Sequence, residues 1–231
     1  MSYVYDGESI RNQRNVNMDS LIIKKRKLPD TTLYLLAVCD GVGSLEDGAF
    51  AASQTIRKLD MWFDFVQDTR RLAFRFRDTL EMADRQIYQE SQRLGLSTAC
   101  TLSALLMDER EGCFYLAHTG DSRIYTYQDG ELTQLTVDQK SNGRLISYIC
   151  RPYGAEFQYV DGSLENRTFL LCSDGLYKRT PQNILERELA VVRPERIRKT
   201  IRKLINYAIQ QGERDNISVA LIVPRHHKEE I

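Results

Sequence analysis

The sequence predicts an α+β fold in which antiparallel strands and helices form separate layers. Short apolar segments follow one another with hairpin-like connections, and the helical segments come in pairs instead of alternating with single strands. Antiparallel strands can be joined by tight turns, whereas parallel strands need a crossover connection, usually a helix. The 231 residues contain no repeat and no Pro-, Gly- or Ser-rich linker, so we expect a single domain over 1–231.

The N-terminal half is expected to begin with two strands and continue with two long helices. The strands, at 20–25 and 33–39, are joined by a polar hairpin connection. The helices are predicted at 46–66 and 68–93, and apolar residues in the second recur every three or four positions, which indicates one buried face. The aromatic residues Trp62, Phe63, Phe65 and Phe74 are interpreted as core or helix-pair packing.

The C-terminal half is expected to consist of short strands and a second helix pair. Strands are predicted at 99–107, 113–118, 123–127, 132–135, 168–172 and 216–223, and helices at 181–189 and 194–211. The last two begin at Pro181 and Pro194, and proline is tolerated in the first turn of a helix. The segment 137–166 has no clear pattern, and no element is assigned there or to the first ten residues.

Composition excludes several classes of function. Thirty-two Lys and Arg balance thirty-two Asp and Glu, which gives no support to nucleic-acid or membrane-surface binding. The longest apolar runs fall well short of the ~20 residues of a membrane span, and residues 1–10 lack the apolar core of a signal peptide. The five cysteines form no C-x-x-C pair, so we expect them to be reduced and the protein to be cytoplasmic.

Several common catalytic motifs are also missing from the sequence. It contains no G-x-x-x-x-G-K-[ST] phosphate-binding loop, no H-E-x-x-H, no G-x-S-x-G and no cysteine followed by arginine six positions later. Only three histidines occur, and two of them, His226 and His227, are adjacent in a polar tail. The third, His118, is expected to be a packed strand residue and not a metal ligand.

Aspartates at the ends of apolar segments are the chemically informative feature. Asp40, Asp121 and Asp174 each end such a segment next to a glycine, and Asp215 directly precedes the last one. Asp-Gly is a common turn pair, so any one of these sites alone is more often only a turn. Four carboxylates gathered at one sheet edge would repel each other unless a cation lay among them. Oxygen ligands favour Mg²⁺ or Mn²⁺ over zinc or copper.

Seven short segments stand out in order along the chain. They are RNVNMD at 14–19, VCDGVG at 38–43, GLSTA at 95–99, GDSR at 120–123, LTVD at 135–138, LCSDGL at 171–176 and DN at 215–216. In this order they resemble the motifs of the metal-dependent serine/threonine phosphatases of the protein phosphatase 2C type, in the bacterial form. Each motif is weak alone, but the ordered series spans nearly the whole chain. The resemblance implies a four-layer α-β-β-α sandwich with two central antiparallel sheets.

The resemblance also implies a role for each matching residue. Asp40 would bridge two Mn²⁺ or Mg²⁺ ions, Asp174 and Asp215 would complete one of them, and the Gly41 carbonyl would serve the other. Asp19 would hold water beside the metals, and Arg14 would grip the substrate phosphate. Asp121 would join Asp174 at a possible third, weaker ion. The implied reaction is hydrolysis of phosphoserine and phosphothreonine in proteins by a water that two metal ions activate.

The sequence also departs from the family pattern. Met18 stands where many relatives have Glu or Gln, Ser44 where Gly is usual, Val42 where eukaryotic members have His, and Gln139 where His is common. The flap beside the active site, around 139–166, is expected to be short. Met18, Ser44 and the short flap keep open a pseudophosphatase or phosphoprotein-binding regulatory module on the same fold. A more remote alternative is a regulatory phosphatase with one dedicated partner.

The expected partners follow from the implied reaction. They are a phosphorylated protein substrate and an opposing serine/threonine kinase in a signalling pathway, with no nucleic acid and no membrane. A monomer is expected.

Overall fold

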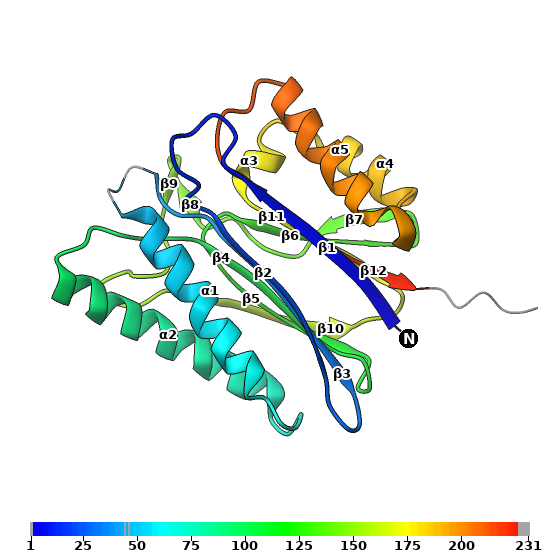
Figure 1. The fold of residues 1–231 in the computed structure, drawn as a ribbon, viewed down its shortest axis with the longest axis horizontal. Coiled ribbons are helices and arrows are strands. Elements are labelled where there is room, and N and C mark those ends of the chain that lie inside the picture. The colour runs from blue at the N-terminus through cyan, green and yellow to red at the C-terminus, as the bar shows by residue number, and fades with distance from the viewer. Residues whose placement is uncertain (1, 44, 46, 226–231) are drawn as a thin grey trace, which may run out of the picture.

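The computed structural model describes residues 2–43, 45 and 47–225, and its centre is a pair of five-stranded antiparallel sheets packed face to face (Figure 1). The first sheet has the order β1 (Ser2–Ile10), β12 (Ile217–Arg225), β11 (Thr168–Cys172), β6 (Arg123–Gln128) and β7 (Glu131–Gln134). The second has the order β10 (Gln158–Ser163), β5 (Cys113–Thr119), β4 (Leu102–Asp108), β3 (Thr32–Cys39) and β2 (Ser20–Lys27). A small hairpin pairs β8 (Lys140–Ser141) with β9 (Arg144–Leu145).

Helices cover the outer faces of both sheets. The long helices α1 (Gly48–Asp64) and α2 (Leu72–Leu94) lie on the second sheet, and α4 (Gln182–Ala190) and α5 (Ile197–Gln210) lie on the first (Figure 1). A short helix, α3 (Asp174–Tyr177), directly follows β11, and a 3-10 turn, Pro194–Arg196, precedes α5. The expected α+β fold with four layers is therefore confirmed.

Strand β3 shows how the sequence specifies these layers. Residues 33–39 of this strand are completely buried. Because neighbouring side chains of a strand point to opposite faces, Leu33 and Leu35 pack under the helices α1 and α2, whereas Tyr34, Leu36 and Val38 pack between the two sheets. A strand that is covered on both faces reads as an unbroken apolar run. The run at 33–39 thus encodes a central strand.

Two strands of the main sheets were missed in the sequence, besides the small hairpin of β8 and β9. Strand β1 carries Asp6 and Glu8 in its middle, yet it pairs with β12 along its whole length, from Ser2 to Ile10. Strand β10, within the unpatterned segment 137–166, pairs with β5. Both lie at sheet edges, where one side of the strand faces solvent and polar side chains are tolerated. Their hydrogen bonding comes from strands distant in sequence, so local patterning does not reveal them.

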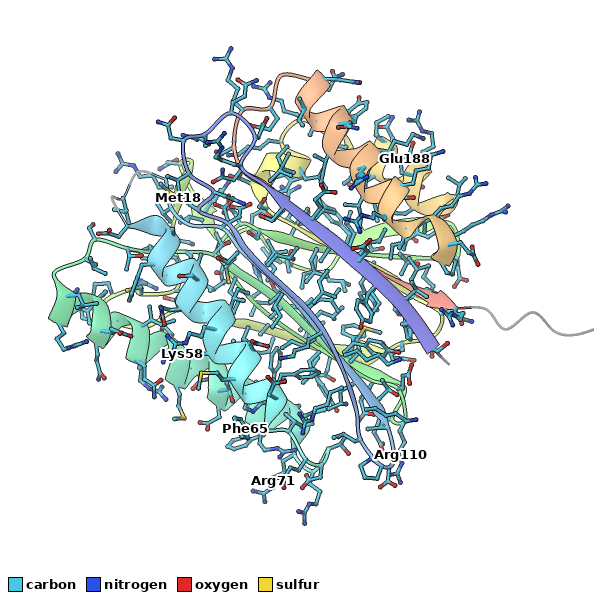
Figure 2. The ribbon with its side chains drawn as sticks, viewed as in Figure 1. Met18, Lys58, Phe65, Arg71, Arg110 and Glu188 are labelled. Atoms are coloured by element: carbon cyan, nitrogen blue, oxygen red, sulfur yellow. The ribbon has the colours of Figure 1, made fainter. Side chains whose placement is uncertain are left out.

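Two other expectations need correction. The second helix begins at Leu72 and not at 68, because Arg71 has a left-handed backbone (φ 52°) that a helix cannot include. The predicted packing of the aromatic cluster holds for Phe63, which is buried, but Phe65 and Phe74 are 77% and 63% exposed. Figure 2 shows Phe65 at the C-terminal end of α1. The predicted start of the first helix, at Glu46, lies outside the described residues.

None of the helices in the described part of the chain is long and apolar enough to cross a membrane.

His118 is buried within β5, as expected for a packed strand residue. Its Nδ1 lies 3.0 Å from Ser103 Oγ, and its Nε2 lies 3.2 Å from the carbonyl oxygen of Val137. Burial lowers the pKa of His118 from 6.5 to about 4, although nearby acceptors and Asp138 favour the charged form. The folded protein therefore keeps this imidazole neutral over a pH range in which the unfolded chain would protonate it.

We predict that His118 makes the folded protein less stable as the pH falls from 6.5 towards 4. In that window the unfolded chain binds one proton more than the folded chain, so the free energy of unfolding decreases with decreasing pH. A shift of this size corresponds to a loss of about 3 kcal/mol. Urea unfolding of wild type and His118→Gln at pH 7.5 and pH 4.5 measures it, and the variant should lose less stability on acidification.

A His226→Gln/His227→Gln double variant serves as the control for the remaining histidines and should retain the wild-type loss. An equal loss in His118→Gln and wild type would show that His118 does not contribute.

Candidate active site

Five aspartates lie at one end of the sandwich, where strands from both sheets begin or end. Asp40 follows β3, Asp121 lies just after β5, Asp174 begins α3, Asp215 precedes β12 and Asp19 precedes β2. Four of them line a cleft of about 640 Å³, and Asp19 is buried outside its lining. Figure 2 shows Met18, another lining residue, at this end of the molecule and Phe65, Arg71 and Arg110 far from it.

The other predicted site residues, Arg14 and Gly41, also line this cleft. A Cβ atom on Gly41 would lie 2.6 Å from the carbonyl oxygen of Gly48 and 2.7 Å from that of Met18. Only glycine fits such a close approach between the start of α1 and the segment before β2. The sequence therefore places a backbone carbonyl, and no side chain, next to Asp40.

Asp40 is the carboxylate without a partner. Its backbone is fixed, because its N–H donates to Thr101 Oγ1 (3.0 Å) and its carbonyl oxygen accepts from the Thr101 N–H (2.9 Å). No described residue forms a hydrogen bond or ion pair with its carboxylate. Burial, followed by the charges of Asp19, Asp174, Asp121 and Asp215, raises its pKa well above the usual range. The Asp40 carboxylate therefore has no positively charged partner among the described residues.

Asp19 is buried behind the cleft and held by two hydroxyl groups. Ser173 Oγ and Ser218 Oγ donate to its Oδ2 at 2.8 and 2.7 Å. Burial raises the pKa of Asp19 to about 6, the two hydroxyl groups partly offset this, and Asp174 and Asp215 add to it. Ser173 and Ser218 belong to β11 and β12 or their ends, so Asp19 connects the β1–β2 loop to the first sheet.

The other three carboxylates each carry a side-chain cation. Arg14 forms a two-pronged pair with Asp215, with Nε to Oδ1 at 2.9 Å and Nη2 to Oδ2 at 2.8 Å. Although burial opposes it, the guanidinium lowers the net pKa of Asp215. Lys178 Nζ pairs with Asp174, and Lys140 Nζ pairs with Asp121.

These pairs affect how the acidic residues are arranged. Over residues 2–43, 45 and 47–225, no three His, Cys, Asp or Glu side chains stand close enough together to hold one ion as they lie here. The predicted ligands thus share a cleft, but three of the four lining carboxylates are turned to a lysine or an arginine.

The donor set nevertheless fits a hard divalent cation. The cleft offers carboxylates and a backbone carbonyl, and oxygen-only ligation selects Mg²⁺ or Mn²⁺. Asp40 is unpartnered in the negative field of four other aspartates, which a divalent ion would neutralise. The Arg14 guanidinium is more than half exposed and can turn away from Asp215, and a carboxylate such as Asp174 has two oxygens, so it can keep a lysine on one and offer the other.

Asn216 positions the loop that carries Arg14. Its Nδ2 donates to the carbonyl oxygens of Arg11 (2.9 Å) and Val16 (3.0 Å), and its Oδ1 accepts from the Met18 N–H (2.9 Å). A Cβ atom on Gly175 would overlap the Asn216 carbonyl oxygen, so glycine lets α3 pack closely here. Asn216 thus links Asp215, the Arg14 loop and the start of α3.

The family of this chain follows from its similarity to known proteins. A sequence profile described as protein phosphatase 2C matches residues 7–221. The chain belongs to this family.

Relatives within the family agree with the assignment. The chain is 27% identical over 214 residues to the serine/threonine phosphatase stp of Listeria monocytogenes, covering 81% of this chain and 83% of that protein. It is 31% identical over 216 residues to the serine/threonine protein phosphatase PstP of Mycobacterium tuberculosis, covering 81% of this chain but 40% of that one. The expected resemblance to metal-dependent serine/threonine phosphatases is confirmed.

Solved structures agree in fold. The catalytic domain of PstP in complex with two manganese ions superposes with a TM-score of 0.81 at 25% identity, covering 96% of this chain and 99% of that one. Stp1 of Staphylococcus aureus gives a TM-score of 0.86 at 19% identity, covering 98% and 96%. At that identity the second comparison concerns the fold alone.

Several residues of this protein phosphatase 2C site were not predicted from the sequence. Ser173 and Ser218, which hold Asp19, lie at the start or end of strands where serine gives no distinctive signal. Lys178 could have been noticed, because it follows Asp174 by four residues and the two can meet across one helical turn. Lys140 lies in the unpatterned segment, and no signal in the sequence places it beside Asp121.

We predict that Asn216→Ala destabilises the protein and frees the Arg14 loop. The substitution removes three partly buried hydrogen bonds to the loop backbone, which amounts to about 2–4 kcal/mol. Chemical denaturation measures the loss, and amide hydrogen exchange should become faster at 11–18 while β3 stays protected. Asn206→Ala, an exposed position on α5, is the matched control and should change neither. Unchanged exchange at 11–18 would contradict this role of Asn216.

Proposed function

We propose that this chain hydrolyses phosphoserine and phosphothreonine in proteins, with two Mn²⁺ or Mg²⁺ ions bound between Asp40, Asp174, Asp215 and the Gly41 carbonyl. The observation that carries the proposal is Asp40. Its backbone is fixed, its carboxylate has no partner among the described residues, and the charges of four other aspartates act on it. The structure of PstP with two manganese ions supports it, because that catalytic domain shares the fold of this chain.

When bound, the metal pair supplies an activated water and neutralises charge on the phosphoryl oxygens. The chain itself contributes orientation and charge. The backbone of Asp40 is held by Thr101, which keeps this residue at the cleft. Asp19 is held by its two serines behind the cleft, which fixes the orientation of its carboxylate.

Arg14 is assigned to the substrate phosphate. Its guanidinium is 54% exposed at the mouth of the cleft and already adopts a two-pronged geometry with Asp215. A phosphate group offers oxygens to the same fork. We infer that Arg14 would exchange Asp215 for the phosphate, which would leave the Asp215 carboxylate free to hold a metal ion.

The proposal extends to the surroundings of the reaction. The substrate is a phosphorylated protein, a serine/threonine kinase opposes the enzyme in signalling, and the segment 139–166 forms a short flap of the single domain. The proposal also takes the protein to be a monomer. The five cysteines are free, as a reducing compartment requires, which supports a cytoplasmic location.

The alternative is a pseudophosphatase that binds a phosphoprotein without hydrolysing it. The ammonium groups beside Asp121 and Asp174 favour it, since they compete with metal for two carboxylates. Met18 lines the cleft where an acidic or amide side chain is usual, and Ser44 lies outside the described residues. The unpartnered Asp40 argues against it, because a phosphate-binding pocket without metal has no use for a free carboxylate.

We predict that Asp40→Asn abolishes metal-dependent turnover while the protein remains folded. The amide cannot replace a bridging carboxylate, and no described residue depends on the Asp40 side chain for a hydrogen bond. The measurement is hydrolysis of p-nitrophenyl phosphate and of a phosphothreonine peptide after EDTA treatment, with and without Mn²⁺. Asp60→Asn, which removes a carboxylate on α1 that pairs with Lys24 of β2, is the control and should stay active.

Wild-type protein that binds Mn²⁺ and phosphopeptide but shows no turnover would establish the pseudophosphatase. Wild-type turnover in Asp40→Asn would show that the metal pair is assigned to the wrong residues.

We predict that Arg14→Ala raises the KM for phosphopeptide or lowers kcat/KM about ten- to a hundredfold, because charge-assisted hydrogen bonds contribute about 1.5–3 kcal/mol. Mn²⁺ affinity should not fall, since the substitution leaves Asp215 free of its guanidinium. Steady-state kinetics and calorimetric Mn²⁺ titration separate the two effects. Arg14→Lys keeps the charge but not the fork and should be intermediate. If all kinetic constants were unchanged, Arg14 would be only a solvated charge.

A further inference from the structure

The family resemblance assigns a third ion to Asp121 and Asp174, and in this structure each of these carboxylates forms an ion pair with a lysine. Lys140 Nζ pairs with Asp121, whose side chain is only 5% exposed, and Lys178 Nζ pairs with Asp174, whose side chain is 15% exposed. Both lysines line the catalytic cleft. Each carboxylate is thus more buried than the lysine that neutralises it, so both lysine side chains approach their carboxylates from the solvent side.

Lys140 is held in place by the residue before it. The Gln139 N–H donates to the Gly120 carbonyl oxygen (2.7 Å), and Gln139 Oε1 accepts from the Gly120 N–H (2.8 Å). Gln139 Nε2 also donates to the Glu156 carbonyl oxygen (2.9 Å). This double clamp fixes the start of the β8–β9 hairpin against the turn that contains Asp121, so that Lys140 reaches the carboxylate.

Lys178 is placed by the short helix α3. Tyr177, its neighbour, donates its hydroxyl hydrogen to the Asp121 carbonyl oxygen (2.9 Å), and the Arg123 guanidinium lies over the Tyr177 ring at 3.6 Å. Arg123 itself is fixed by two hydrogen bonds to Asp138, at 2.9 and 2.8 Å. The end of α3 is therefore tied to the turn of Asp121, and Lys178 follows directly after this tie.

We propose that Lys140 and Lys178 supply the positive charge beside Asp121 and Asp174 that a third divalent ion would otherwise supply, so that the chain takes two ions and not three. The inference rests on the proposed two-metal function. A divalent ion beside Asp121 would lie close to the ammonium groups of Lys140 and Lys178. Because all three charges are positive, their repulsion would oppose binding of the ion. The lysines are part of the fold, so this charge is present at any metal concentration.

The test counts bound Mn²⁺ ions and needs no activity measurement. EDTA-stripped protein is titrated with Mn²⁺ in a calorimeter, and free Mn²⁺ is followed by electron paramagnetic resonance. We expect two ions per chain for wild type and three for Lys140→Met/Lys178→Met, because methionine keeps the apolar stem and removes the charge. Adding Asp121→Ala to the double variant should return the number to two.

Lys203→Met is the matched control, because Lys203 Nζ pairs with the buried Glu188 at 2.7 Å away from the cleft, and it should bind two ions. The single variants Lys140→Met and Lys178→Met are measured too, in case the double variant does not fold. Three ions in wild type, or no additional ion in any folded lysine variant, would overturn the inference and leave the two-metal function standing. Wild type that binds no Mn²⁺ would overturn the proposed function itself.

Discussion

The need to hold like charges together governs the active end of this molecule. Five aspartates converge where the two sheets meet, and two charges about 4 Å apart repel by about 4 kcal/mol near a protein surface. The fold reduces this repulsion in several ways. Arginine and lysine side chains cover three carboxylates, serine hydroxyls hold Asp19, and Asp40 alone is left without a partner. The negative charge of the site is therefore least compensated at Asp40, where a metal ion would bind.

The sandwich provides the rigidity on which this arrangement depends. Strands β3, β11 and β12, beside which Asp40, Asp174 and Asp215 lie, are buried on both faces, and apolar side chains form three layers of core between helices and sheets. Close-packed interiors of this kind do not deform gradually. The turns at the strand ends can thus hold carboxylates near one another without relaxing, and Gly41 and Gly175 allow the backbone segments to approach closely enough to do so.

The sequence predicted the parts of the site that have a local signature. Asp40, Asp121 and Asp174 were found because each follows an apolar strand and neighbours a glycine, and the structure places all three in one cleft. The edge strand β1 and the residues Lys140 and Ser218 could not be found in this way. Their positions depend on pairing with segments far along the chain, and such pairing leaves no periodicity in the local sequence. Local pattern thus indicated which acidic residues converge, and tertiary contacts decided which cations meet them.

The position of β12 has a consequence for synthesis on the ribosome. This strand lies inside the first sheet, between β1 and β11, although it is the last strand described in the chain. The N-terminal strand β1 must wait for it, and so must Asp215 and Asn216, which precede it. Pairing between segments so distant in sequence is slow, and it exposes unpaired strand edges until it is complete. While residues 217–225 are still in the exit tunnel, the second sheet and its two helices can form, but the cleft cannot. A nascent chain of this protein therefore has no assembled active site until residues 217–225 have left the tunnel.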